Sequence, residues 1–128
     1  MVVVDTHVLV YDALEPRRLS VRARRALEGD GGPIAASDIS LWEIAMLIAK
    51  GRIDPSADPV RFIEKIIEAR GIRILPVTAR IAVLAQADSF AHGDPADRII
   101  AATAVVNRAP LVTADKALRR IHGMETIW

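Results

Sequence analysis

Residues 2–14 of the chain read VVVDTHVLVYDAL and place a short apolar strand directly before a helix. The run Val2–Val4 is wholly apolar, which is typical of a strand that is covered on both faces. We predict a helix over Thr6–Leu14, which Pro16 prevents from extending much further. Asp5 stands between the two elements, at the carboxyl end of the predicted strand.

Strands and helices continue to alternate along the rest of the chain. We expect strands over residues 34–36, 72–77 and 111–113, and an edge strand over 125–128. We expect helices over residues 17–27, 37–50, 59–70, 79–88, 95–108 and 115–120, with a loop at His92 and Gly93. This alternation indicates βαβ units and a mainly parallel sheet, so the predicted fold class is α/β.

Length and composition favour one soluble domain over residues 1–128. A chain of 128 residues, of which 52% are hydrophobic, can build an ordinary core. Cys is absent, so disulfides and thiolate metal sites are excluded. We see no signal peptide and no apolar stretch that could span a membrane, and we expect a cytoplasmic protein.

Two acidic residues directly follow predicted strands. Asp5 follows the first strand, and Asp115 follows the strand over residues 111–113. In an open parallel sheet, ligand sites lie outside the carboxyl ends of the strands, so both positions are candidate functional positions. The alternative is that each carboxylate only caps the helix that comes after it.

Two further acidic residues interrupt apolar helical sequence. Glu43 is the one polar residue of LWEIAMLIA at 41–49, and Asp97 precedes the apolar run at 99–102. A buried carboxylate needs a hydrogen-bond partner or a cation. Glu43 could instead close a capping box with Ser40, and Asp97 could simply favour the helix dipole while Asp94 caps that helix.

Carboxylates from separate elements are the ligands that a hard divalent cation prefers. Such a cation offsets the charge of a phosphodiester and supplies a bound hydroxide near neutral pH. Mg²⁺ takes a few carboxylates and keeps several waters, and Mn²⁺ accepts similar ligands. The histidines His7, His92 and His122 do not share a metal-ligand spacing. The sequence therefore predicts Mg²⁺ or Mn²⁺ and not zinc.

Four segments of the sequence resemble the motifs of PIN-domain nucleases, and of the VapC toxins among them. They occur in the family's order and cover essentially the whole chain. The segments are VDTH at 4–7, SDISLWEI at 37–44, HGDPADR at 92–98 and LVTAD at 111–115.

The resemblance implies a three-layer α/β sandwich, with a short, mainly parallel sheet flanked by helices around an acidic pocket. It implies that Asp5 and Asp97 are the principal Mg²⁺ ligands, and that Glu43 and Asp115 complete the catalytic and metal site. Asp94 ranks second because of its capping position, and Thr6 and Thr113 could support the ligands by hydrogen bonds.

The resemblance also implies a function. VapC toxins hydrolyse RNA, form homodimers and are neutralised by a cognate antitoxin protein. We therefore expect a metal-dependent endoribonuclease that acts as the toxin of a toxin–antitoxin pair.

The charge of the chain says less about how RNA would bind than the acidic motifs say about the reaction. The net charge is only +1, but the predicted helix over 17–27 is rich in arginine. This cluster either contacts RNA phosphates or is a solvated helix face. Aromatic residues make up 4% of the chain, which argues against an aromatic ladder for single strands. The cluster consists of Arg17, Arg18, Arg22, Arg24 and Arg25.

Other functions remain open. A phosphatase-like hydrolase could use Asp5 as its nucleophile, although the second acid usual two residues later is replaced by His7. A receiver-like module would need an acid at the end of the strand over 72–77, which has none. A non-catalytic α/β binding domain, whose acids only cap helices, is the strongest alternative.

Overall fold

A five-stranded parallel sheet forms the centre of the protein. The computed structural model describes residues 1–90 and 93–128, so His92 lies outside the described residues. The strand order is β3-β2-β1-β4-β5, and every neighbouring pair runs parallel. The α/β prediction is confirmed. The strands are β1 (Val2–Val4), β2 (Ile34–Ser37), β3 (Arg73–Leu75), β4 (Leu111–Val112) and β5 (Thr126–Ile127).

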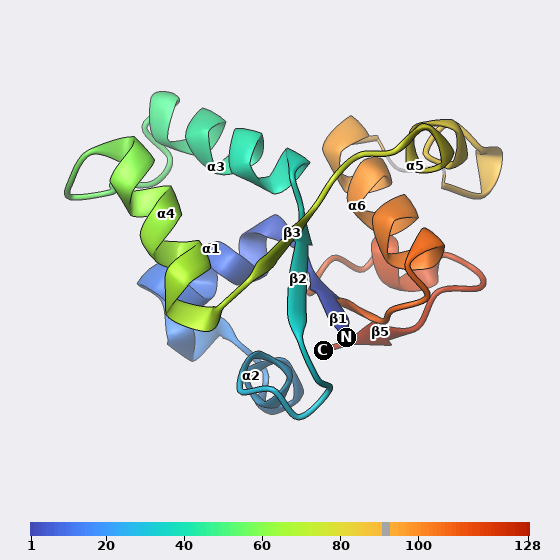
Figure 1. The fold of residues 1–128 in the computed structure, drawn as a ribbon, viewed down its shortest axis with the longest axis horizontal. Coiled ribbons are helices and arrows are strands. Elements are labelled where there is room, and N and C mark those ends of the chain that lie inside the picture. The colour runs from blue at the N-terminus through green and yellow to red at the C-terminus, as the bar shows by residue number, and fades with distance from the viewer. Residues whose placement is uncertain (91–92) are drawn as a thin grey trace.

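Helices cover both faces of this sheet and give three layers (Figure 1). The helices α1, α3 and α4 lie on one face, and α5 and α6 lie on the other. α2 lies at the end of the sheet near the two chain termini. The α-helices are α1 (Thr6–Leu14), α2 (Val21–Leu27), α3 (Ile39–Ala49), α4 (Pro59–Arg70), α5 (Ala79–Leu84) and α6 (Pro95–Val106). Short 3₁₀ turns are η1 (Pro16–Arg18), η2 (Asp88–Phe90) and η3 (Leu118–Arg120).

The two faces of the sheet carry separate hydrophobic cores. Side chains alternate along a strand, so Val2 and Val4 pack on one face and Val3 on the other. The first core continues into α1–α4, and the second is built largely on α6, where Ile100 is fully buried. Burial on both faces explains why the β1 sequence is continuously apolar.

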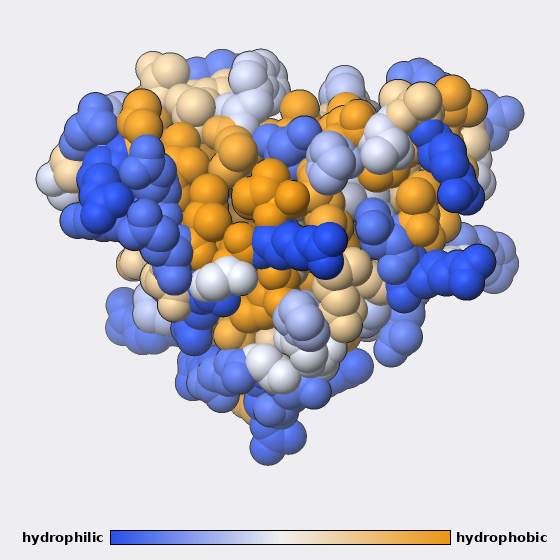
Figure 2. Space-filling view, viewed as in Figure 1, coloured by the Kyte–Doolittle hydropathy of each residue, from blue (hydrophilic) through white to orange (hydrophobic). Residues whose placement is uncertain are grey.

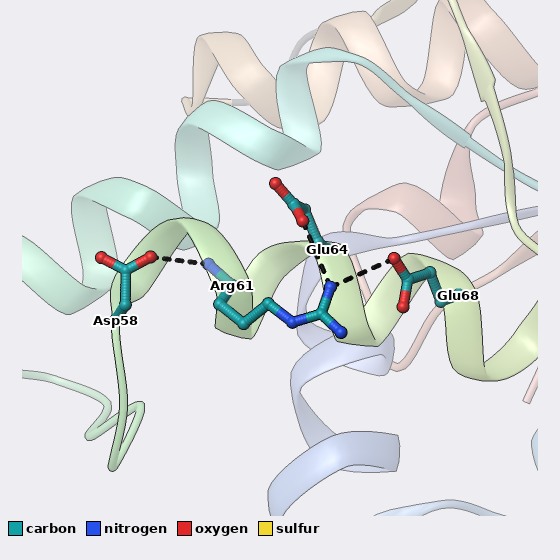
Figure 3. Close-up of polar contacts among 4 residues, drawn as sticks. All are labelled: Asp58, Arg61, Glu64 and Glu68. Atoms are coloured by element: carbon teal, nitrogen blue, oxygen red, sulfur yellow. Dashed lines mark hydrogen bonds and ion pairs between the residues drawn. The ribbon is translucent and has the colours of Figure 1, made fainter.

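The outer side of α4 faces solvent. Asp58 caps this helix by accepting a hydrogen bond from the Arg61 amide at 3.0 Å. The Arg61 guanidinium lies 3.3 Å from both Glu64 and Glu68 (Figure 3). These side chains are about half exposed, so the ion pairs contribute little to stability.

The prediction of one continuous helix over residues 17–27 is wrong. η1 ends at Arg18, Leu19 is extended, and α2 begins only at Val21. Ser20 causes the interruption, because its hydroxyl accepts a hydrogen bond from the Ala23 amide at 3.0 Å and caps α2. The predicted apolar stripe that includes Leu19 is nevertheless buried.

Several other predicted boundaries are too long. β3 ends at Leu75, directly before Pro76, and α5 ends at Leu84 with the separate turn η2 following. Only η3 forms within the helix expected over 115–120, because the Asp115 carboxylate holds the preceding turn. α6 stops at Val106, and the edge strand over 125–128 is confirmed as β5. Within the part of the chain that the structure describes, no helix is long and apolar enough to cross a membrane.

Candidate metal centre

The predicted acidic residues come from elements that meet at the carboxyl end of the sheet. Asp5 follows β1 and Asp115 follows β4, and these two strands are direct neighbours. Glu43 lies in α3 and Asp97 in the first turn of α6, and these helices contact each other. Asp5 and Glu43 are each 3% exposed and Asp97 is 7% exposed, so these acids are buried.

Asp5 is held by a buried threonine. The Thr113 hydroxyl donates to Oδ2 of Asp5 at 2.6 Å, and the Asp115 amide donates to the Thr113 hydroxyl at 3.0 Å. Oδ1 of Asp5 accepts a long hydrogen bond, 3.4 Å, from the His7 amide and thereby caps α1. Thr113 therefore connects the two acids that follow β1 and β4.

Burial raises the pKa of Asp5 above its ordinary value, because the charged form loses its hydration. The hydrogen bond from Thr113 and the nearby His7 act in the opposite direction, and the negative charge of Asp115 raises the pKa further. A cation at this position would lower the pKa of Asp5 again, because it would compensate the buried negative charge.

Glu43 does not form the capping box with Ser40. The N-cap of α3 is Asp38, which places Glu43 in the second turn of the helix. Oε1 of Glu43 instead accepts a hydrogen bond of 2.6 Å from the Thr6 hydroxyl. Thr6 has one hydroxyl proton, so its 2.9 Å contact with Ser40 requires Ser40 to be the donor. The chain of hydrogen bonds runs from Ser40 through Thr6 to Glu43.

Burial is also the main reason why the pKa of Glu43 is raised. The bond from Thr6 lowers it, whereas the negative charges of Asp94 and Asp5 raise it. The two buried acids Asp5 and Glu43 therefore share one electrostatic environment, and His7 lowers the pKa of both.

The structure places the Asp94 carboxylate close to two other acids. One carboxylate oxygen from each of three residues lies within 4.8 Å of the other two. The residues are Glu43, Asp94 and Asp97. Asp94 also caps α6 by accepting from the Ala96 amide at 2.9 Å. Capping does not remove it from the site, because a carboxylate has two oxygens.

Asp115 lies at the edge of this assembly. Its Oδ1 accepts hydrogen bonds from the amides of Ala117 and Leu118 at 2.8 and 3.1 Å, which hold the turn before η3, although the N-cap of η3 is Ala117. It is half-buried, and its charge acts on Asp5. The predicted residues are thus brought together as one close group of Glu43, Asp94 and Asp97, beside Asp5 and Asp115.

The chemistry of this donor set fits a hard divalent cation. The ligand atoms are carboxylate oxygens, which Mg²⁺ and Mn²⁺ prefer, and the chain has no cysteine to favour zinc. Buried acids with raised pKa values repel one another, so the site is electrostatically incomplete without a positive charge. The residues present therefore fit such a metal ion.

The arginine cluster is divided between two elements, η1 and α2. Arg18 belongs to η1 and packs over Tyr11, whereas Arg22, Arg24 and Arg25 belong to α2. α2 lies at the opposite end of the sheet from the start of α3 and α6, where the acids are (Figure 1).

Comparison with known proteins gives consistent results. The chain is 39% identical over 130 residues to Ribonuclease VapC22 from Mycobacterium tuberculosis, and the match spans 99% of this chain and 98% of that protein. Two solved structures with a similar fold are VapBC2 from Rickettsia felis bound to a promoter DNA fragment and FitAcB from Neisseria gonorrhoeae. The first has a TM-score of 0.70 at 18% identity and the second 0.65 at 22%, with at least 96% of each chain covered.

The sequence pattern of the PIN domain matches residues 2–124, which include every acidic residue of the candidate site. The parallel sheet and its flanking helices agree with the likeness to these solved structures. The chain therefore belongs to the PIN domain family.

Proposed function

We propose that this protein is a metal-dependent ribonuclease and the toxin of a toxin–antitoxin pair. The observation that carries the proposal is the group of Glu43, Asp94 and Asp97 carboxylates, within 4.8 Å of one another beside buried Asp5. Buried carboxylates destabilise the fold unless hydrogen bonds or a positive charge compensate them, and ligand sites lie at the carboxyl end of a parallel sheet. The 39% identity to a ribonuclease supports RNA as the substrate.

We propose Mg²⁺ as the ion, with Mn²⁺ as an acceptable substitute. Asp5 and Asp97 are its principal ligands, and Glu43 and Asp115 complete the site directly or through water. The proximity of Asp94 to Glu43 and Asp97 adds it to the candidate ligands. The ion would polarise the phosphoryl oxygen and make a bound water acidic enough to attack near neutral pH.

The surrounding residues keep the acids in place for this chemistry. Thr113 fixes Oδ2 of Asp5, and Thr6 fixes Oε1 of Glu43, each through a bond of 2.6 Å. Both hydroxyls favour the ionised carboxylate, which is the form that binds a cation. We propose that these threonines act as positioning residues.

We also propose a cognate antitoxin and a homodimer as partners. Another solved structure with a similar fold is a toxin–antitoxin complex from Klebsiella pneumoniae, with a TM-score of 0.65 at 24% identity. Apolar side chains reach the surface between α4 and the region of β3 (Figure 2), where Ile63, Ile67 and Ile74 are only half-buried. Exposed apolar surface of this kind is available to a protein partner.

One alternative keeps support from the structure. Asp5, Asp94 and Asp115 all cap helices or turns, as a non-catalytic binding domain would require. Capping does not explain Glu43, which makes no such contact in the second turn of α3. A nucleophilic Asp5 is disfavoured, because it is 3% exposed and both oxygens accept hydrogen bonds.

The test is cleavage of purified total RNA by the folded protein with Mg²⁺ and with EDTA. Asp97→Asn serves as the matched control, because it removes a charge and keeps the shape of the side chain. Discrete fragments that disappear with EDTA and in the variant would support a metal-dependent ribonuclease. Absence of cleavage by folded, antitoxin-free protein would favour the binding-domain alternative.

A further inference from the structure

A cavity that is lined in part by His7 lies near the acidic site. Its volume is about 210 Å³, and it lies among α1, η1 and the end of α3. One wall consists of apolar side chains such as Val10 and Leu47, and the other residues are polar or charged. The proposed metal site uses none of them. The polar and charged lining residues are His7, Tyr11, Glu15, Arg18 and Arg52.

His7 connects this cavity to the acids. It lies two residues after Asp5, is exposed, and acts electrostatically on both Asp5 and Glu43. It also lines the cavity, and its ring centroid is 6.3 Å from that of Tyr11, one helical turn further along α1. A chain of nucleotides whose phosphate reached the acids would therefore pass the mouth of this cavity.

Arg18 and Tyr11 form a flat platform in the cavity. The Cζ atom of Arg18 lies 4.2 Å from the centroid of the Tyr11 ring. Tyr11 holds the guanidinium from one side, while the Arg18 side chain remains 55% exposed. Unpaired RNA bases stack on aromatic rings and on guanidinium planes in this way. The low aromatic content of the chain does not prevent this, because one platform suffices for one base.

Charged groups at the rim can read the edge of a base. Glu15 lies 3.8 Å from Arg18 and is 62% exposed, so this loose ion pair can open at little cost. The Glu15 carboxylate accepts hydrogen bonds, whereas the Arg52 guanidinium only donates them. Guanine is the base that offers N–H donors on one edge and the acceptors O6 and N7 on another.

From this combination we propose that the cavity binds an unpaired guanine of the RNA, next to the bond that is cut. The inference rests on the proposed ribonuclease function, since it names a nucleotide that this function would recognise. It makes Glu15 and Arg52 the specificity-determining residues, gives Arg18 the stacking surface, and leaves the acids as the catalytic centre.

The first experiment measures binding without cleavage. Short unstructured RNA oligonucleotides that differ at one position, G against A, C or U, are titrated in EDTA and followed by fluorescence anisotropy. We expect the G oligonucleotide to bind best. Arg18→Ala should weaken its binding about tenfold, as loss of one stacking platform does. Arg24→Ala on α2 is the matched control, because it removes an exposed arginine that does not line the cavity and should leave the binding unchanged.

The second experiment maps cleavage in a randomised RNA pool with Mg²⁺. We expect G at a fixed position beside the cut in the wild-type protein, and a relaxed preference in Glu15→Gln and Arg52→Ala. Cleavage whose base preference is absent, or unchanged in both variants, would overturn the inference and leave the ribonuclease function intact. Absence of wild-type cleavage would count against the function, and the binding experiment would still decide whether the cavity takes guanine.

Discussion

Replacement of Thr113 by valine tests how the site holds a buried charge. Valine has nearly the same shape as threonine, so the change removes two hydrogen bonds and leaves the packing of a fully buried side chain intact. The lost contacts are the donation to Asp5 at 2.6 Å and the acceptance from the Asp115 amide at 3.0 Å.

The magnitude follows from the kinds of bond that are lost. A hydrogen bond to a charged group contributes about 1.5–3 kcal/mol, and the amide of Asp115 would lose its acceptor as well. We expect Thr113→Val to lower the free energy of unfolding by about 2–3 kcal/mol above neutral pH. Thr113→Ser keeps the hydroxyl and loses one methyl group, so it should cost only about 1 kcal/mol.

The pH dependence gives the sharper test. Thr113 lowers the pKa of Asp5, which burial raises, so the variant should have a still higher Asp5 pKa. A raised carboxyl pKa in the folded state means that stability is present at low pH and is lost as pH rises through that pKa. The variant loses more on this rise, so its deficit relative to wild type should be larger at neutral pH than at about pH 4, the ordinary range of an aspartate.

The assay is urea unfolding in EDTA, followed by tryptophan fluorescence and analysed by linear extrapolation. Mn²⁺ affinity, measured by electron paramagnetic resonance, provides a second readout and should fall about 10–100-fold in the valine variant. A deficit that is equal at both pH values would refute the assignment of the bond to ionised Asp5. Unchanged Mn²⁺ affinity would refute the positioning role of Thr113.

Further predictions concern the other parts of the site and the fold. Asp97→Asn should lower RNA cleavage about 100-fold or more, as loss of a metal ligand does, while circular dichroism shows an unchanged fold. Asp5→Asn should raise the melting temperature in EDTA at neutral pH, because it removes a buried charge whose pKa is raised; a lower melting temperature would contradict this. Mg²⁺ at about 100 times its Kd should stabilise the wild-type protein by about 2.7 kcal/mol, and calorimetric titration should show weaker binding as pH falls, because protons compete for the buried acids. Asp12→Ala should cost about 1 kcal/mol in urea unfolding, since the bidentate pair with Arg70 at 2.8 and 2.9 Å joins α1 to α4, whereas Glu64→Ala should cost almost nothing.

The fold was predictable because local and global preferences agree over most of the chain. Val2–Val4 is continuously apolar since both sheet faces are covered, and Asp58-Pro59 begins α4 as capping rules require. The prediction fails where a side chain competes with the backbone of a helix. Ser20 and Asp115 each accept amide hydrogen bonds and restrict the helix around them.

The acidic site was predictable in composition and not in its hydrogen bonds. Asp5 and Asp115 follow strands, and parallel topology brings such positions together without further information. Thr6 and Glu43 lie 37 residues apart, and Thr113 and Asp5 lie 108 apart. Contacts at this separation depend on the register between elements, which a single sequence does not contain.

Capping and metal binding are not alternatives at this site, although the sequence presents them as such. Oδ1 of Asp94 accepts from the Ala96 amide and so fixes the start of α6, while a carboxylate oxygen of the same residue lies within 4.8 Å of those of Glu43 and Asp97. A carboxylate offers about four lone-pair sites on two oxygens, so one oxygen can accept the backbone hydrogen bond while the other stays available to a cation. The amide that is capped also orients the side chain, because it restricts rotation about the Cα–Cβ bond. Helix capping is therefore a means by which this fold places its acids.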